Sequence, residues 1–359
     1  MLEVNIKRKV PGFNLDVTFS VDGEMLGILG PSGSGKTMTL QCIAGLLRPD
    51  QGLIKLNNKV LFDSSEQVSL QAQARKVGFV FQNYALFPHL STIENIAYGM
   101  RNCQRQEIFE RVQTLIDKMK LEGLQNRYPR QLSAGQQQRV AIARALATEP
   151  EVLLLDEPFS ALDSMVKKQL ELEVMKLQQF YSGNIILVTH DLAEAYRLCS
   201  ALAIYESGKV VQFDQKQKVI SSPVNKQVAR ITRCTNFMDG IIAEIRDSSV
   251  WVMVPDLGIN LKVVANDHRN MLVNQAVTIG VRPEYIRIAQ GPGQNILLSP
   301  LDSVVESIAT INCYFCLDTV SGGRYYLETI FPKSDAQLLS NGQKYYLYLP
   351  PEHITIISD

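Results

Sequence analysis

The sequence lacks a surplus of charge of either sign. Its 359 residues include 36 Lys and Arg against 36 Asp and Glu, so the formal net charge is zero. Proteins that bind nucleic acids usually carry a basic surplus, and the balance therefore argues against a nucleic-acid partner. The chain also lacks an apolar run of the roughly 18–20 residues that cross a bilayer. Its amino terminus has no apolar core of signal-peptide length, so we expect a chain that does not enter the membrane by itself.

Cysteine is scarce as well. Six cysteines, at positions 42, 103, 199, 234, 313 and 316, are too few in 359 residues for a disulfide framework, which suits a reducing cytoplasm. Cys313 and Cys316 form one CxxC pair, but a zinc site needs about four ligands. We therefore interpret this pair as chance neighbours on a strand. With 46% hydrophobic and 20% charged residues, the composition excludes the disordered and fibrous classes.

The length predicts two or three domains, and the apolar pattern changes near residue 232. Before it, continuous apolar runs alternate with stretches of helical periodicity such as 104–120 and 164–180. Continuous apolar runs are typical of parallel strands that helices cover on both faces. The runs occupy residues 24–32, 76–82, 151–157, 184–190 and 201–207. An α/β domain with a helical insertion is therefore predicted over 1–232.

After residue 233 the pattern becomes one of short strands broken by Gly, Pro and Asn. Two segments resemble each other, VTIGVRPEYIRIA from Val277 and YYLYLPPEHITII from Tyr345. Each places a Pro-Glu pair between two alternating strands. This repeat predicts two small OB-like β-barrels, over 233–289 and 290–359. A single β-domain with coincidental Pro-Glu turns is the alternative.

A glycine-rich loop carries the sharpest chemical signal. It fits the pattern GxxxxGK[ST], and it follows an apolar strand and precedes a helical stretch. Its residues are Gly30, Pro31, Ser32, Gly33, Ser34, Gly35, Lys36 and Thr37. Glycines allow successive N–H groups to face phosphates, the lysine neutralises the β- and γ-phosphates, and the threonine hydroxyl binds Mg²⁺. The loop predicts a site for ATP with Mg²⁺.

Two carboxylates end the apolar run 151–157. Asp156 and Glu157 follow four apolar residues, at the sheet edge where open α/β folds bind their ligands. We expect Asp156 to hold the Mg²⁺ shell and Glu157 to polarise the attacking water.

A second phosphate-binding signal lies 20 residues before that run. Leu132-Ser133-Ala134-Gly135-Gln136 opens a strong helical stretch, and the N–H groups at a helix start bind anions. A domain with its own glycine-rich phosphate loop (the P-loop, residues 30–37) has no obvious need for another phosphate site. We therefore expect Ser133 and its neighbours to serve the nucleotide of a second copy of the chain.

With these motifs the sequence resembles the ATP-binding subunits of ABC transporters, over residues 1–230. Beyond the P-loop and the two carboxylates, the resemblance is carried by Gln82 in FVFQNYALFPHL, the signature residues Ser133, Ala134, Gly135 and Gln136, the D-loop Ser160, Ala161, Leu162 and Asp163, and His190 in LVTHD. It implies that Gln82 touches Mg²⁺ and the attacking water, that His190 contacts the γ-phosphate, and that Asp163 crosses a dimer interface. The implied catalytic residues are Glu157, His190 and Gln82, and the implied Mg²⁺ ligands are Thr37, Gln82 and Asp156.

Two positions depart from the family pattern. Ala134 stands where the signature usually has glycine, which is tolerable only if its φ angle is negative. The family also commonly stacks an aromatic ring on adenine, about 30 residues before the P-loop lysine. This neighbourhood, Ile6 to Lys9, holds no aromatic residue. Phe13 and Phe19 are interpreted as strand core, which leaves Arg8 as the candidate to stack on adenine.

The residues after 232 resemble the barrel extension of importer ATPases for sulfate, maltose, polyamines, iron and molybdate. GVRPEYIRI is the characteristic segment, and the terminal barrel and LNNKVLFDSS are most similar to molybdate importer subunits. In those subunits the last segment binds oxyanions. Their Ser-Arg pair before Asn-x-Leu is replaced here by Gly293-Gln294 before Asn295.

The resemblance implies a peripheral ATPase on the cytoplasmic face of the membrane, working as a homodimer on a separate permease and, indirectly, with a solute-binding protein. The apolar segment from Tyr84 to Leu90 is the expected contact with the permease. Molybdate or a related oxyanion is the expected cargo, with sulfate, iron, polyamine or sugar as alternatives. Two other classes stay open. One is an ABC-type machine on DNA or ribosomes, which predicts a coiled-coil insertion or a second cassette that this sequence lacks. The other is an oxyanion regulator or storage protein.

Overall fold

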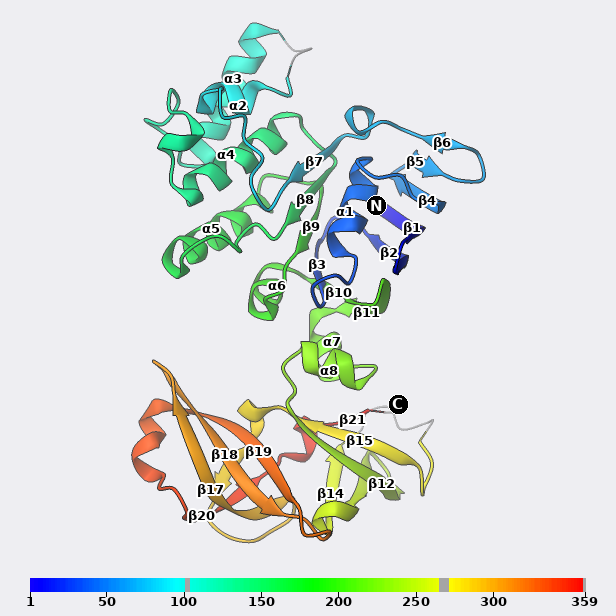
Figure 1. Cartoon of the computed structure of the whole chain (residues 1–359), viewed down its shortest axis with the longest axis vertical. Helices are drawn as coiled ribbons and strands as arrows, with labels where there is room; N and C mark the ends of the chain where they lie inside the picture. Colours follow the sequence, from blue (N-terminus) through cyan, green and yellow to red (C-terminus); the bar gives the residue numbers. More distant parts are fainter. Residues whose placement is uncertain (101–103, 265–270, 358–359) are drawn as a thin grey trace. The chain divides into compact units, whose positions relative to one another are not determined.

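In the computed structural model the described residues are 1–100, 104–264 and 271–357, so Cys103 of the cysteine count lies outside them. The chain divides into two compact units, Met1–Lys216 and Gln217–Asp359 (Figure 1). Each unit is described by itself. The first unit ends at Lys216, whereas the sequence predicted that the first domain ends at residue 232.

An 11-stranded sheet organises the first unit, in the order β6-β5-β4-β1-β2-β11-β10-β3-β9-β8-β7. Its strands are β1 (Leu2–Val10), β2 (Phe13–Val21), β3 (Met25–Leu29), β4 (Gln51–Leu56), β5 (Lys59–Asp63), β6 (Val68–Ser69), β7 (Val77–Val80), β8 (Val152–Asp156), β9 (Asn184–Val188), β10 (Ala201–Glu206) and β11 (Lys209–Gln215). The five predicted apolar runs are β3, β7, β8, β9 and β10. They are parallel neighbours in this sheet, as their composition predicted.

The helices of this unit are α1 (Lys36–Ala44), α2 (Thr92–Ala97), α3 (Arg105–Lys118), α4 (Ala134–Ala147), α5 (Ser164–Leu177) and α6 (Leu192–Leu198), with short 3₁₀ turns η1 (Ala72–Ala74) and η2 (Pro129–Gln131). Leu40 and Ile43 of α1 lie in the same core as the buried faces of β1, β2, β3 and β8. In Figure 1, α4, α5 and α6 lie on the other side of β3 and β7–β9 from α1. Helices α2, α3 and α4 form the helical insertion between β7 and β8 that the sequence predicted.

The second unit begins with α7 (Lys216–Ser221), which starts at the division, and α8 (Lys226–Ile231), and continues as two five-stranded antiparallel sheets. The first sheet, β14-β13-β12-β15-β21, contains β12 (Asn236–Arg246), β13 (Ser249–Val254), β14 (Ile259–Val264), β15 (Ala276–Val281) and β21 (Ile354–Ile357). The second, β16-β20-β17-β18-β19, contains β16 (Arg287–Ala289), β17 (Ile296–Glu306), β18 (Thr310–Asp318), β19 (Arg324–Pro332) and β20 (Lys344–Tyr348). The 3₁₀ turns are η3 (Pro255–Leu257), η4 (Pro283–Tyr285), η5 (Lys333–Leu338) and η6 (Pro351–His353).

The internal repeat of the sequence is visible in this topology. Both Pro-Glu pairs form a 3₁₀ turn, η4 and η6, and the rings of Tyr285 and His353 in these turns stack with centroids 4.0 Å apart. The strand that follows each turn joins the sheet of the other repeat, so β16 pairs with β20 and β21 pairs with β15. The boundary predicted at 289/290 therefore does not separate the two sheets. One apolar core serves both.

The two cysteines of the CxxC pair lie on β18, so their predicted position on a strand is confirmed. Cys313 is buried, Cys316 is partly exposed, and both are free thiols. Among the described residues, no group of His, Cys, Asp and Glu side chains has the arrangement of a metal site.

Candidate functional site

The P-loop connects β3 to α1 and takes a conformation that requires glycine. Gly33 and Gly35 have φ angles of 78° and 99°, in the left-handed region. A Cβ atom at Gly30 would collide with the backbone carbonyl oxygen of Tyr205. Gly35 caps the N-terminus of α1, where free N–H groups and the helix dipole favour an anion. The loop thus has the backbone geometry that a phosphate chain needs.

Lys36 and Thr37 begin α1 and reach the centre of the site. The Lys36 Nζ atom donates to the carbonyl oxygens of Gly30 and Pro31 at 2.9 and 2.8 Å. Burial lowers the pKa of Lys36, while the charges of Glu157 and Asp156 act in the opposite direction. The Thr37 hydroxyl donates to Asp156 Oδ1 at 3.0 Å. The Thr37 hydroxyl oxygen and the Asp156 carboxylate oxygen are metal ligands of the kind that Mg²⁺ prefers.

Glu157 lies at the meeting point of three segments. Its backbone has a φ angle of 45°, and its N–H donates to the carbonyl oxygen of Val188 at the end of β9. Its Oε2 atom is 3.3 Å from His190 Nδ1 and 3.4 Å from Gln82 Nε2. The Gln82 amide also lies 3.4 Å from the Ser160 hydroxyl. The structure therefore brings together Gln82, Glu157 and His190, the three residues that the sequence proposed as catalytic.

Sheet order explains this convergence. β3, β9, β8 and β7 are adjacent and parallel, so their carboxyl ends lie at one edge. The P-loop follows β3, Gln82 follows β7, Asp156 ends β8, and His190 follows β9. Open α/β sheets bind ligands at this edge. Four residues or loops separated by up to 160 positions thus share one site.

The signature residues do not join this site within one copy of the chain. Ser133 caps α4, and a capping box links it to Gln136. Over the described residues, no hydrogen bond connects 133–136 to the P-loop. Ala134 begins α4 and is not among the residues with positive φ. This is the condition under which alanine can replace the usual glycine of the signature. Asp163 accepts hydrogen bonds from the N–H groups of Met165 and Val166 as the cap of α5.

Sequence reasoning missed an aromatic ring beside the P-loop. Phe13 was interpreted as strand core together with Phe19, which is indeed buried. Phe13 does pack against the core of this unit, but its ring is only half-buried and also lies 3.0 Å from the position that a Cβ of Gly35 would take. The Arg8 guanidinium, the predicted adenine contact, donates instead to the carbonyl oxygen of Arg48. No local signal in the sequence places this ring beside the loop, because the contact joins the start of β2 to a residue 22 positions further along the chain.

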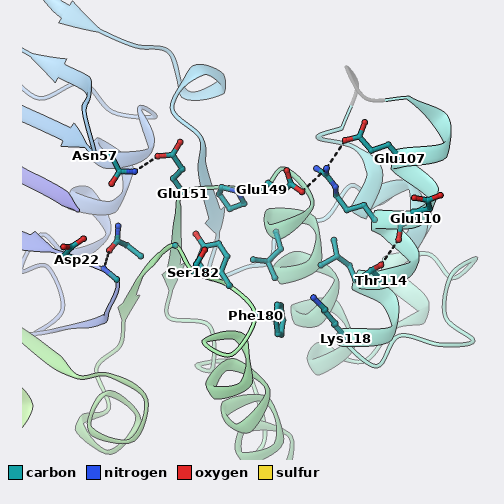
Figure 2. Close-up of a pocket in the computed structure, with 18 of the residues that line it drawn as sticks. Asp22, Asn57, Glu107, Glu110, Thr114, Lys118, Glu149, Glu151, Phe180 and Ser182 are labelled. Atoms are coloured by element: carbon teal, nitrogen blue, oxygen red, sulfur yellow. Dashed lines mark hydrogen bonds and ion pairs between the residues drawn. The ribbon is translucent and has the colours of Figure 1, made fainter.

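A cavity of about 850 Å³ lies elsewhere in the first unit. It is lined mainly by α3, the chain near Glu149–Glu151 and the segment Phe180–Asn184, and Figure 2 shows its charged and aromatic lining. None of the residues that the sequence assigned to nucleotide, metal or catalysis lines it. Its carboxylates are paired within the lining or with neighbours, such as Glu107 and Glu149 with Arg111. We therefore place the functional site at the sheet edge.

The β-unit gives no support to the predicted oxyanion site. Asn295 is buried, and its amide is fully used: it donates to the carbonyls of Lys262 and Leu349 and accepts from the Lys262 N–H. Asn236, at the equivalent place in the other repeat, bonds Val281 and Glu328 in the same way. A cavity of about 380 Å³ beside Asn295 has neither Lys nor Arg in its lining. Both asparagines join the two sheets.

Comparison with known proteins decides the family. Residues 14–160 match the family model described as ABC transporter. The chain is 37% identical to a spermidine/putrescine import ATP-binding protein of Nitratidesulfovibrio vulgaris, over 90% of this chain and 86% of that protein. The chain belongs to the family of ABC importer ATP-binding subunits. Members of this family are ATPases whose hydrolysis of ATP is coupled to import, and this chain binds ATP as they do.

Two further matches cover a smaller share of this importer subunit. A sulfate/thiosulfate import ATP-binding protein of Xanthomonas campestris is 43% identical over 64% of this chain and 67% of its own length. A solved structure, an ATP-binding cassette in a dimeric post-hydrolysis state bound to ADP and Pi, is 31% identical with a TM-score of 0.52. It covers 60% of this chain and 99% of that chain.

Proposed function

We propose that this importer subunit hydrolyses ATP in a site completed by a second copy of itself. The observation that carries the proposal is the Glu157 carboxylate, which Gln82 and His190 contact at the same sheet edge as the P-loop. A carboxylate held in this way orients and polarises a water molecule for attack on the γ-phosphate. His190, whose side chain is 66% exposed beside Glu157, would contact this phosphate.

Mg²⁺ would neutralise the charge that develops on the phosphates. The Thr37 hydroxyl, the Asp156 carboxylate and Gln82 would hold it. The P-loop residues Gly30 to Thr37 would bind the phosphates, with Phe13 against the adenine.

The second copy would supply its signature. Ser133 and the first N–H groups of α4 form an anion-binding helix start, and no hydrogen bond uses them for the P-loop in the part of the chain described. The dimeric relative described above supports this arrangement. Asp163 and its loop would then lie at the dimer interface.

Transport requires a separate membrane partner. In the described ranges, 1–100, 104–264 and 271–357, no helix has the length and apolar character needed to span a bilayer. We propose that the subunit lies on the cytoplasmic face of the membrane and contacts a permease through the segment Tyr84–Leu90. Leu86 and Phe87 of this segment are partly exposed, close to Gln82.

For cargo we propose a polyamine. The polyamine-importer relative matches 90% of this chain and therefore includes most of the β-unit, whereas the sulfate-importer relative matches 64%. Molybdate, the cargo expected from the sequence, has no support from these relatives or from the lining of the cavity beside Asn295. Sulfate is the second candidate because of its higher identity over the first unit.

Uptake measurements test the cargo. A strain that lacks this chain should lose ATP-dependent uptake of labelled putrescine and spermidine, while uptake of labelled sulfate and molybdate should persist. The intact chain should restore uptake, and the Glu157→Gln variant should not. Loss of sulfate uptake alone would move the assignment to sulfate, and loss of molybdate uptake alone would restore the expectation from the sequence.

A further inference from the structure

The segment that follows Gln82 has an unusual backbone. Tyr84 and Ala85 are consecutive and have φ angles of 62° and 45°, in the left-handed region that side chains with a Cβ rarely adopt. The Tyr84 N–H donates to the carbonyl of Phe81, and the Ala85 N–H donates to that of Asn83. Two such residues in succession persist only where surrounding contacts hold them.

Arg144 on α4 supplies contacts of this kind. Its Nη1 atom donates to the Ala85 carbonyl at 2.7 Å, and its Nη2 atom donates to the Tyr84 carbonyl at 2.9 Å. Its guanidinium also lies over the ring of Phe87, 5.5 Å from the centroid. A guanidinium is a rigid planar fork, so it can grip two successive carbonyls at once, whereas the single ammonium of lysine cannot match that geometry.

The same helix begins at the signature. Ser133 caps α4, and Arg144 lies ten residues beyond Ala134, roughly 15 Å along the axis. The helix is mostly buried, and Arg139 anchors it to α5 through an ion pair of 2.8 Å with Glu173. A buried helix of this length moves as a rigid element, so a displacement of its start also displaces Arg144.

The far end of the segment is held by another element. Asn95 of α2 is fully buried, and its side chain accepts from the Phe87 N–H and donates to the carbonyls of Phe87, Leu90 and Ser91. The segment therefore has two attachments, the left-handed turn on α4 and residues Phe87–Leu90 on α2. Arg144 connects the segment directly to the helix of the signature, through the turn and through its contact with the Phe87 ring.

We propose that Arg144 is a positioning residue that transmits the position of α4, set by the nucleotide of the second copy, to the turn Tyr84–Ala85. Gln82 lies two residues before this turn, and the turn is the first part of the proposed permease segment Tyr84–Leu90. The inference rests on the proposed function, because it assumes that ATP bound by one copy engages Ser133 of the other. Beyond the proposed function, the inference adds that Arg144 connects the contact between ATP and Ser133 to Gln82 and to the permease segment.

Hydrogen exchange of the purified full chain tests the inference. The parent is the Glu157→Gln variant, measured with and without Mg-ATP and read at the amides of Tyr84, Ala85 and Phe87. We expect ATP to change their exchange rates several-fold in this parent. Adding Arg144→Lys, which keeps the charge but loses the fork, should reduce the change to less than twofold. The exchange of residues 31–37 should respond to ATP equally in both.

The matched control is Arg139→Lys in the same parent. It makes the same chemical change on the same helix, and its side chain contacts Glu173 rather than the turn. It should keep the full response at residues 84–87. A general weakening of α4 would instead affect both lysine variants, so this comparison separates positioning from a structural role.

A parent-like response in Arg144→Lys overturns the inference. If that variant does not fold, Ala85→Gly in the same parent replaces it, because glycine frees the turn while leaving Arg144 intact. Loss of its response at residues 84 and 87 supports the inference, and a parent-like response overturns it. If residues 31–37 show no response to ATP in any variant, the proposed nucleotide site itself is wrong, and the inference falls with it.

Discussion

Two carboxylates that are neighbours in the sequence have different surroundings. Asp156 is 5% exposed, and burial raises the pKa of its carboxyl, an effect that the hydrogen bond from Thr37 opposes. The Glu157 side chain is 24% exposed and, from its left-handed backbone position, faces Gln82 and His190. The first is thus suited to a metal ion and the second to a water molecule.

Glu157→Gln should retain ATP binding and lose most turnover. The amide keeps the size of the side chain but cannot accept a proton, and removal of a positioned general base costs roughly 10²–10⁴-fold in rate. Steady-state hydrolysis and equilibrium binding of ATP measure the two effects. Glu151→Gln is the matched control, since Glu151 lies before the opposite end of β8, and it should hydrolyse ATP at the native rate. A native rate of hydrolysis in Glu157→Gln would show that Glu157 is not the general base.

Phe13→Ala should raise the KM for ATP about tenfold and leave kcat within about twofold. Stacking of a base on an aromatic ring contributes about 1–3 kcal/mol, and the loss affects binding rather than the transfer step. Phe13→Trp, which keeps a flat aromatic surface, should retain a low KM. An unchanged KM in Phe13→Ala would show that the ring beside Gly35 does not contact the nucleotide.

At the scale of elements, the P-loop helix is fixed at its carboxyl end by a buried charge. Arg75 is 1% exposed and donates to the carbonyls of Cys42 and Ile43 at the end of α1 and to that of Leu70. Burial lowers its pKa from the ordinary value, yet a guanidinium stays protonated. A cation at a helix carboxyl end is also favoured by the helix dipole. Arg75 thereby connects α1 to the chain that leads into β7 and Gln82.

Arg75→Met should destabilise the first unit by about 2–4 kcal/mol. Methionine fills part of the space but removes the Arg75 donors from the carbonyls of Ile43 and Leu70, and a buried carbonyl without a donor costs about 1–3 kcal/mol. Urea unfolding followed by circular dichroism measures the change. Lys76→Met is the control, because the Lys76 side chain is 64% exposed and its ion pair with Glu151 should contribute about 0–1 kcal/mol. Equal stability of the two variants would contradict this account.

At the scale of the whole molecule, the site that we propose is divided between two copies of the chain. The P-loop, Gln82, Glu157 and His190 converge within one copy, whereas Ser133 and the start of α4 are bonded only among themselves in the residues described. ATP is then the ligand that joins two copies, and binding to the associated state shifts the equilibrium towards the dimer.

Ser133→Arg should abolish the ATP-dependent dimer. In the Glu157→Gln background, trapped Mg-ATP should give a dimer in sedimentation velocity, and the larger arginine side chain should crowd the phosphate position at the start of α4. Ser65→Arg, at an exposed serine of the same unit, should dimerise normally. Monomers with bound Mg-ATP in the parent itself would contradict the composite site.

The local chemistry of this protein could be predicted from its sequence. The P-loop, the pair Asp156-Glu157 and the apolar strands could be identified because each depends on neighbours within a few residues. Three features became known only from the fold: Phe13 lies against Gly35, β16 and β21 exchange sheets, and Arg144 donates to the carbonyls of Tyr84 and Ala85. Each of these depends on contacts between residues 22 to 79 positions apart. Such contacts are set by how whole strands and helices pack, and no local spacing in the sequence encodes them.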